Sequence, residues 1–278
     1  IYYLLEDDLY ALEGDTSLPE DYRTRLSRYA SEELRLILER ATEIVAPSQA
    51  ILDRFPDHKR TRLQPAYTTL CCDFSHFEGE AVRIVFPGTR SHLSDLMPLA
   101  EGLRRLLDRQ PSLSLTTFLG SHAPPSLVGH SRVLNRPAEK WPRYKRTLKT
   151  ARFHLALAPN RDTAFNRGRS INKIFDVAAL GAAGFYSDRL PSSHVVTHNI
   201  DGLLLRDEPD EWIAAIERHT HDRAKLLNMA RAGTRLAQNC GDPNRLRCFW
   251  LSRLIPNYPS TQSAKSIHLK RPFLPSSA

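Results

Sequence analysis

Two turns in the chain combine glycine with a cation in a way that could hold a phosphate group. Gly88, Thr89 and Arg90 follow the apolar run AVRIVF and precede a helical pattern. A helix that starts there would offer backbone N–H groups to a diphosphate, and Arg90 would add a forked donor. Lys173 opens the second segment, KIFDVAALGAAGFYSD, and could add another positive charge. Simpler roles compete, since Gly88 can serve only to permit its turn and Arg90 can be a solvated surface charge.

The segment that begins at Lys173 predicts the helix and the strand that would position this cation. Phe175, Ala178 and Leu180 fall on or near one helical face, and Gly181 then ends the helix. The run GFYSD that follows has the character of a short strand. A helix followed directly by a strand is typical of a parallel α/β layer, so Lys173 would lie near a ligand crevice.

Regular alternation of strands and helices extends over residues 81–240. The strand-like runs are AVRIVF, LSLTTFLG, SRVL, FHLALAP, GFYSD and GLLLR, and helical patterns separate most of them. This order predicts an α/β fold with a doubly wound parallel sheet, covered on both faces, that binds ligands at the carboxyl ends of its strands. We therefore predict one complete domain over residues 81–240.

The flanking segments predict a partial second domain and a C-terminal extension. Residues 1–66 contain a strand with an acidic loop (YYLLEDDLY), a helix over about 21–41, a strand (EIVAPS) and a short helix, which is only part of a Rossmann-like domain. Residues 67–80 lack periodicity and predict a linker or hinge. A helix is expected within 241–258, and a disordered tail over 259–278. Because the chain starts without Met inside a strand-like run, we expect upstream sequence to be missing.

Composition narrows the class of protein and its partners. The formal net charge of +8 favours an anionic partner, such as a phosphorylated substrate, an anionic membrane or nucleic acid. The sequence lacks RNP signatures, zinc-finger spacing and basic heptad helices, which argues against nucleic acid. It also lacks an apolar run of about 18 residues and a signal peptide, so we expect a cytoplasmic protein. The four cysteines lack CxxC spacing, which favours reduced thiols.

Three motifs occur in an order that resembles a known family. They are IVFPGTRSHLSDL, FNRGRSINKIFDVAALGAAGFYSD and NIDGLLLRDEPDEWIAAIERH. The chain resembles the retaining, GT-B-fold glycosyltransferases of family 4, well over residues 81–238 and loosely over residues 1–66. The resemblance implies that a nucleotide-diphosphate sugar binds between two domains as the donor substrate, with no other cofactor and no bound metal.

The resemblance also implies roles for particular residues. The family carries two glutamates eight positions apart, the first near the donor sugar and the second on the nucleotide ribose. Asp176 occupies the second place, whereas Gly168 occupies the first, so the first acid is absent. Asp162 and Asn166, in the loop after the strand FHLALAP, are the candidate catalytic substitutes. The commoner fate of such an Asp is a turn or a helix cap.

Two histidines and an acidic cluster complete the set of candidates. His92 would lie near the phosphates, and His194, in the loop after GFYSD, would lie close to the donor. Asp95, in the first turn of the same helix as His92, is more simply explained by capping and by the helix dipole. The acidic run at residues 6–8 could bind a metal, but a solvated loop is the simpler interpretation.

These observations lead to one function and its competitors. The resemblance implies hexose transfer, with retention, to a polysaccharide, lipid-linked or protein acceptor. The absent acid and the short N-terminal part favour an alternative, an inert nucleotide-sugar-binding or assembly module of a polysaccharide-synthesis protein. A third possibility is a GT-B-like nucleotide-sugar epimerase. Basic residues between 143 and 149 could contact the inner face of an anionic membrane, although a solvated helix face explains them equally well.

Overall fold

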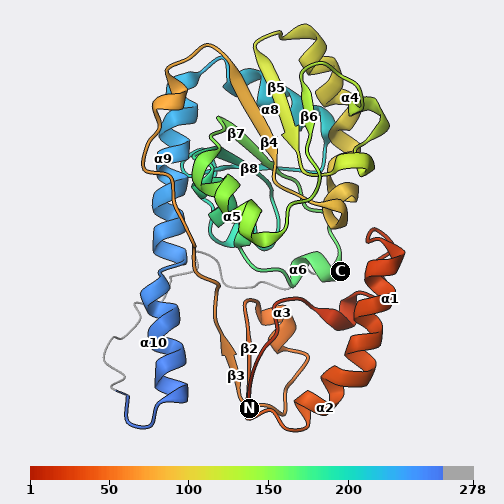
Figure 1. Cartoon of the computed structure of the whole chain (residues 1–278), viewed down its shortest axis with the longest axis vertical. Coiled ribbons are helices and arrows are strands. Elements are labelled where there is room, and N and C mark those ends of the chain that lie inside the picture. Colours follow the sequence, from red (N-terminus) through yellow and green to blue (C-terminus); the bar gives the residue numbers. More distant parts are fainter. Residues whose placement is uncertain (259–278) are drawn as a thin grey trace, which may run out of the picture.

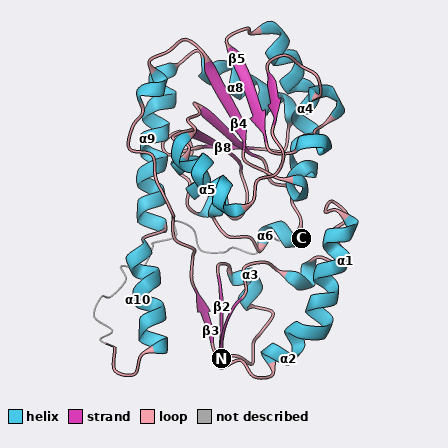
Figure 2. Ribbon diagram, viewed as in Figure 1, coloured by secondary structure: helices cyan, strands magenta, loops and turns pink. Residues whose placement is uncertain are grey.

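The computed structural model describes residues 1–258 and contains two parallel β-sheets, one in each half of the chain (Figures 1 and 2). The predicted disordered tail, residues 259–278, lies outside the described residues. The smaller sheet lies in the N-terminal half and the larger sheet in the C-terminal half, so the two halves are described in turn.

The C-terminal sheet has six parallel strands in the order β6-β5-β4-β7-β8-β9. The strands are β4 (Val82–Phe86), β5 (Leu113–Thr117), β6 (Val133–Asn135), β7 (Leu155–Ala158), β8 (Ala183–Ser187) and β9 (Leu203–Leu205). The chain builds outward from β4 in one direction and then resumes from β7 in the other. This reversal between β4 and β7 is the switch point of a doubly wound sheet, where ligands bind. The predicted fold class is thereby confirmed.

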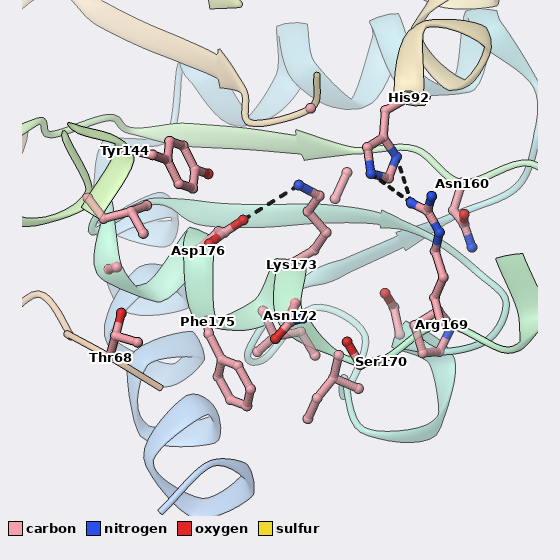
Figure 3. Close-up of a pocket in the computed structure, with 18 of the residues that line it drawn as sticks. Thr68, His92, Tyr144, Asn160, Arg169, Ser170, Asn172, Lys173, Phe175 and Asp176 are labelled. Carbon is pink, nitrogen blue, oxygen red and sulfur yellow. Dashed lines mark hydrogen bonds and ion pairs between the residues drawn. The ribbon is translucent and has the colours of Figure 1, made fainter. Parts of the chain in front are cut away.

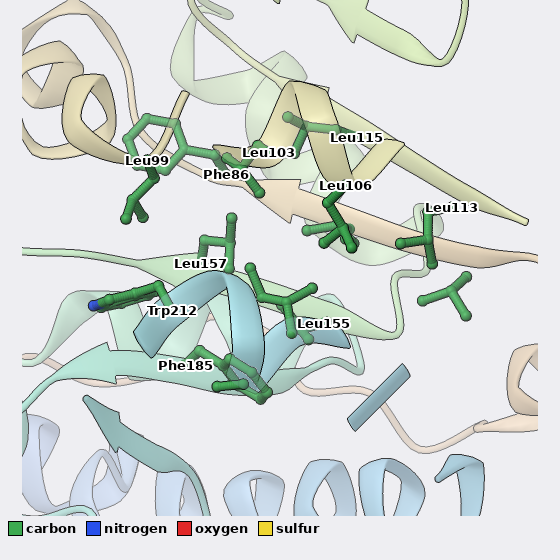
Figure 4. Close-up of a cluster of buried hydrophobic side chains, with 14 of the residues drawn as sticks. Phe86, Leu99, Leu103, Leu106, Leu113, Leu115, Leu155, Leu157, Phe185 and Trp212 are labelled. Carbon is green, nitrogen blue, oxygen red and sulfur yellow. The ribbon is translucent and has the colours of Figure 1, made fainter. Parts of the chain in front are cut away.

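Successive residues of the central strands point to opposite faces of this sheet, and both faces are covered by helices. The central strands are therefore apolar on both faces. Ile84 and Phe86 of β4 join one apolar cluster, shown in Figure 4, whereas Val85 joins the other. On the first face lie α4 (Leu93–Arg109) and α8 (Pro209–Thr220), which pack against each other. On the second lie α5 (Trp141–Thr150) and α7 (Asn172–Ala179), while α9 (Arg223–Cys240) contributes residues to both clusters.

The N-terminal half forms a three-stranded parallel sheet in the order β1-β2-β3. The strands are β1 (Tyr2–Leu4), β2 (Glu43–Ala46) and β3 (Arg60–Arg62), and the helices are α1 (Glu20–Tyr29), α2 (Arg35–Leu38) and α3 (Gln49–Leu52). The single helix expected over about 21–41 is interrupted by a π-helical stretch, Ala30–Leu34. A π-helical turn is wider than an α-helical one, so Ala30, Leu34 and Leu38 all stay on the buried side.

Two elements tie the halves together. The short helix α6 (Ala164–Arg167) follows β7, yet its Phe165 is fully buried in the N-terminal apolar core with Leu9 and Ile51. The last described helix, α10 (Pro243–Leu254), lies beside the N-terminal sheet (Figure 1), where Arg253 forms an ion pair with the buried Glu43 at 3.3 Å. The C-terminal half therefore contributes side chains to the packing of the N-terminal half.

The segment predicted as a linker, residues 67–80, joins the two sheets while packing against the C-terminal half. The N–H of Cys71 donates to Ala178 O at 3.1 Å, and Phe77 is buried in the same core as β4. All four cysteines lie in the described part of the chain, and all four are free thiols. Among residues 1–258 we find no helix whose length and hydrophobicity would let it cross a membrane.

Candidate functional site

A cavity of about 440 Å³ lies between the two halves, at the carboxyl ends of β4 and β7. Gly88 follows β4, Asn160 follows β7, and the first turn of α7 carries Lys173 into the same space. Residues of the N-terminal half and of the linker close the other side: Glu6, Asp7, Ala66, Thr68 and Thr69. The cavity therefore occupies the switch point of the C-terminal sheet and is completed by the N-terminal half.

Lys173 and Asp176 form an ion pair in this cavity (Figure 3). The ammonium of Lys173 lies 3.5 Å from Asp176 Oδ2, and it donates a hydrogen bond to Pro87 O at 2.6 Å. One helical turn separates the two residues, so both side chains project from the same side of α7. Burial lowers the pKa of Lys173 and raises the pKa of Asp176, while each charge opposes the shift of the other. The result is a half-buried cation tied to the loop that follows β4.

The phenol of Tyr144, on α5, faces Asp176 from the opposite wall of the cavity (Figure 3). Burial and the negative charge of Asp176 raise the pKa of Tyr144 well above its usual range. Tyr144 is therefore a neutral hydroxyl at physiological pH. Together the two side chains offer a hydrogen-bond donor and an acceptor to a ligand hydroxyl.

A second polar group is built from His92, Asp95 and Arg169. His92 Nδ1 lies 3.0 Å from Asp95 Oδ2, and Arg169 Nη1 lies 2.7 Å from His92 Nε2. Burial, followed by the charge of Arg169, lowers the pKa of His92 to about 3, so the imidazole is neutral. Arg169 Nη1 also lies 3.1 Å from His92 Nδ1, so it contacts both ring nitrogens (Figure 3). The tautomer protonated at Nδ1 donates to Asp95 and leaves Nε2, the closer nitrogen, to accept from Arg169. His92 thus orients the guanidinium of Arg169 within the cavity.

Comparisons with known proteins identify the architecture. No protein-family model and no curated protein sequence matches the chain. Solved structures match at low sequence identity. Staphylococcus aureus TarM superposes with a TM-score of 0.61 at 10% identity, over 90% of this chain and 49% of TarM. HepE from Anabaena, in complex with UDP and glucose, gives 0.62 at 14% identity, over 90% of this chain and 71% of HepE.

A third match agrees with the first two. Sucrose-phosphate synthase from Thermosynechococcus elongatus gives a TM-score of 0.59 at 14% identity, over 91% of this chain and 67% of the synthase. The fold is that of the GT-B glycosyltransferases. At such identities the likeness concerns the fold, and this chain spans only about half the length of TarM.

Four of the sequence-predicted residues meet in the cavity of this GT-B fold: Gly88, His92, Lys173 and Asp176. A Cβ atom at Gly88 would lie 2.5 Å from the Phe86 ring and 2.9 Å from His92 Cβ, so only glycine fits between them. The sequence predicted that Gly88 belongs to a phosphate-binding turn, with a simple turn as the alternative. In the structure its further role is to let the loop after β4 approach His92 closely.

Three other donor-site candidates lie outside the cavity lining. Arg90 forms an exposed ion pair with Asp21 of α1, 3.0 Å apart, and so bridges the two halves at the surface. Thr89, its neighbour, is also exposed. His194 lies in a short 3-10 helix after β8, half-buried, and burial together with the charge of Arg62 lowers its pKa. The structure therefore does not bring these three residues together with Lys173.

The two candidate catalytic residues, Asp162 and Asn166, belong to the segment that docks onto the N-terminal half. Asp162 is exposed and forms an ion pair with Arg167 at 2.5 Å. Asn166 is buried, and its amide donates to Arg161 O at 3.0 Å. Neither lines the cavity, and both stabilise the loop around α6, whose N-cap is Thr163. Their contacts lie around α6, the helix that carries Phe165 into the N-terminal core.

Gly168 stands where the family that the sequence resembles carries its first glutamate, and it packs tightly in this chain. A Cβ atom there would lie 2.9 Å from Asp8 Cβ and 3.5 Å from Ile51 Cγ1. The backbone at this point packs directly on the N-terminal half, so any side chain at position 168 would require the loop around Asp8 to shift. The neighbouring Arg169 lines the cavity instead.

Several cavity residues were missed from the sequence. Arg169 stands four residues before Lys173 and could have been noticed as a second cation of the same segment. Tyr144 lies among basic residues of α5 and gave no signal, and neither did Asn160, whose position depends on how β7 meets β8. No cluster of three or more His, Cys, Asp or Glu side chains that could hold a metal ion occurs in residues 1–258.

Proposed function

We propose that this chain binds a nucleoside-diphosphate sugar in the cavity between its two halves and transfers the sugar, with retention, to a saccharide, lipid-linked or protein acceptor. The observation that carries the proposal is the Lys173–Asp176 ion pair at the switch point of a GT-B fold. TarM and HepE support it, since structures of both contain UDP.

The diphosphate would meet three kinds of donor on one side of the cavity. The first turn of α7 offers free backbone N–H groups, and the ammonium of Lys173 projects beside them. The guanidinium of Arg169, held by His92, adds a forked donor. When the bond to the sugar breaks, negative charge grows on the departing diphosphate, and these cations would stabilise it.

The nucleoside would be held further along the same helix. Asp176 would accept hydrogen bonds from ribose hydroxyls, with Tyr144 beside it as a donor. Because Lys173 already balances the charge of Asp176, the carboxylate can stay ionised while half-buried. One turn of α7 would therefore contact two parts of the donor, the diphosphate through Lys173 and the ribose through Asp176.

Isothermal titration calorimetry with UDP and with GDP tests this site. We expect one of the nucleotides to bind, and Lys173→Ala or Asp176→Ala to weaken its affinity at least about tenfold, since hydrogen bonds to charged groups contribute about 1.5–3 kcal/mol. Lys149→Ala, an exposed cation of α5 outside the cavity, is the matched control. If neither nucleotide binds at millimolar concentration, the proposal is wrong.

The inert nucleotide-sugar-binding module remains a second candidate because Gly168 excludes the family's first acid. Slow hydrolysis of a nucleotide sugar by the native chain would favour the transferase, whereas tight binding without turnover would favour the module. We also propose a cytoplasmic location, as expected from the sequence, and contact between an anionic membrane and the exposed basic residues of α5. Sedimentation with anionic vesicles would test the membrane contact.

A further inference from the structure

We propose that Asp7, from the N-terminal half, supplies the carboxylate that faces the donor sugar in place of the acid excluded at Gly168. This inference rests on the proposed function and adds a catalytic residue to it. Asp7 lines the cavity from the N-terminal half.

The acidic loop that contains Asp7 fills the position at which the family's first acid would stand. Asp8 Cβ lies 2.9 Å from the point where a side chain at Gly168 would begin. Asp8 itself is committed to the fold, since it is buried, pairs with Arg54 at 2.6 Å and accepts from the N–H of Ala11. Its neighbour Asp7 is the residue of this loop that reaches the cavity while remaining half-buried.

The other acids of the cavity are less suited to this role. In the part of the chain that the structure describes, Glu6, Asp7 and Asp176 are the carboxylates that line it. Asp176 is paired with Lys173, and Glu6 is exposed. Burial raises the pKa of Asp7, and the nearby charge of Arg169 opposes that rise. Geometry places the two residues at the same boundary: Asp7 and Arg169 are the chain neighbours of Asp8 and Gly168, where the halves approach closely, and both line the cavity.

This proximity determines what Asp7 would face. Arg169 is one of the cations proposed to hold the diphosphate, and the sugar is attached to that diphosphate. A carboxylate beside Arg169 would therefore lie beside the first atoms of the sugar.

A carboxylate at this position could stabilise the transition state of sugar transfer. The bond between the anomeric carbon and the β-phosphate oxygen breaks, and a bond from that carbon to the acceptor oxygen forms. The acceptor proton passes to the departing phosphate oxygen. Positive charge develops on the sugar ring in the transition state, where the negative charge of Asp7 would stabilise it. Asp7 is unchanged when the reaction ends.

The variant Asp7→Asn tests this role in the whole chain, because it keeps the size of the side chain and removes its charge. The probes are the nucleotide that binds the native chain, UDP or GDP, and its glucose derivative. We expect affinity for the free nucleotide to stay within about threefold or to rise, because Arg169 loses a competing anion. We expect kcat for hydrolysis of the nucleotide sugar to fall about 100-fold, with little change in KM. Asp57→Asn, an exposed acid of the same half outside the cavity, should change neither quantity.

The outcomes separate this inference from the proposed function. Unchanged kcat in Asp7→Asn, in a native chain that binds and hydrolyses the donor, would overturn the inference alone. So would loss of kcat in Glu6→Gln but not in Asp7→Asn. If the native chain binds the nucleotide sugar without any turnover, Asp7 has no catalytic role, and the inference is overturned while the proposed binding site stands. A native chain that binds neither nucleotide refutes the proposed function, and the inference with it.

Discussion

The guanidinium of Arg169 lies over the ring of Phe165, 4.9 Å from its centroid. Phe165 is buried in the N-terminal core, whereas Arg169 lines the cavity, so one aromatic ring connects the packing of the two halves with the candidate site. The cation–π contact with Phe165 and the hydrogen bond to His92 together hold Arg169 in position. The position of Arg169 in the cavity therefore depends on the packing of Phe165 between the two halves.

Removal of the Phe165 ring should disturb both the packing of the N-terminal core and the position of Arg169. We expect Phe165→Ala to lower the free energy of unfolding by about 3–5 kcal/mol, because it leaves a cavity in the N-terminal core. It should also weaken nucleotide binding, since Arg169 loses its support. Denaturant unfolding and calorimetry measure the two effects. Phe165→Leu, which fills most of the space, should restore stability but not full affinity, and full affinity in Phe165→Leu would argue against the stacking role.

Gly88 gives a sharper test of the loop after β4. Gly88→Ala should destabilise the protein by about 1–3 kcal/mol and displace His92, because the added Cβ overlaps the Phe86 ring. The displaced imidazole would release Arg169, so nucleotide affinity should fall as well. Gly14→Ala is the matched control, since a Cβ at Gly14 meets nothing within 4 Å. Equal thermal stability of the two variants would contradict the packing seen at Gly88.

Restoring the family's first acid should not restore a family-like site. We expect Gly168→Glu to lower stability and nucleotide affinity, because the new side chain would have to separate the halves at Asp8. Thermal unfolding and calorimetry would report both losses. Gly168→Ala should show a smaller loss of stability in the same direction. A gain in hydrolysis of the nucleotide sugar by Gly168→Glu would show that the halves can open enough to admit the acid.

Acid should destabilise the protein through a buried histidine outside the cavity. His154 accepts a hydrogen bond from Arg83 N–H at 2.9 Å and donates to His76 O at 2.8 Å, which requires a neutral ring. Burial, the main cause, lowers the pKa of His154 to about 4. The unfolded chain, with an ordinary histidine pKa near 6.5, therefore binds a proton that the folded chain does not.

The sign of the effect follows from this difference in proton binding. The contribution of His154 to the free energy of unfolding is fully present above about pH 6.5 and decreases as the pH falls toward about 4. By pH 5 the free energy of unfolding should be lower by about 2 kcal/mol. Denaturant unfolding at pH 7 and pH 5 measures the loss. A nuclear magnetic resonance titration assigns it to His154, and a midpoint near pH 6.5 for this ring would refute the explanation.

Much of the fold could be predicted because it depends on local patterns. Alternation of apolar strands with amphipathic helices indicated the doubly wound sheet, and Gly181 marked the end of α7 with a φ of +69°. The same local pattern brought Lys173 and Asp176 to one helical turn, at a strand's carboxyl end. These features need only hydrophobic periodicity and residue spacing, and both can be read along the chain.

Only the tertiary structure decided which charged residues share the cavity. Arg90 and Asp162 both stand in loops at the expected end of the sheet, but each forms an ion pair outside the cavity. Arg90 pairs with Asp21, which is distant in the sequence, and Asp162 pairs with Arg167 through the fold of its own loop. Asp7 is more than 150 residues from Arg169, as their numbering shows, and the two line one cavity because the halves pack together at Phe165. Electrostatic partnership depends on separation in space, so it follows from packing between halves and cannot be read from the order of residues.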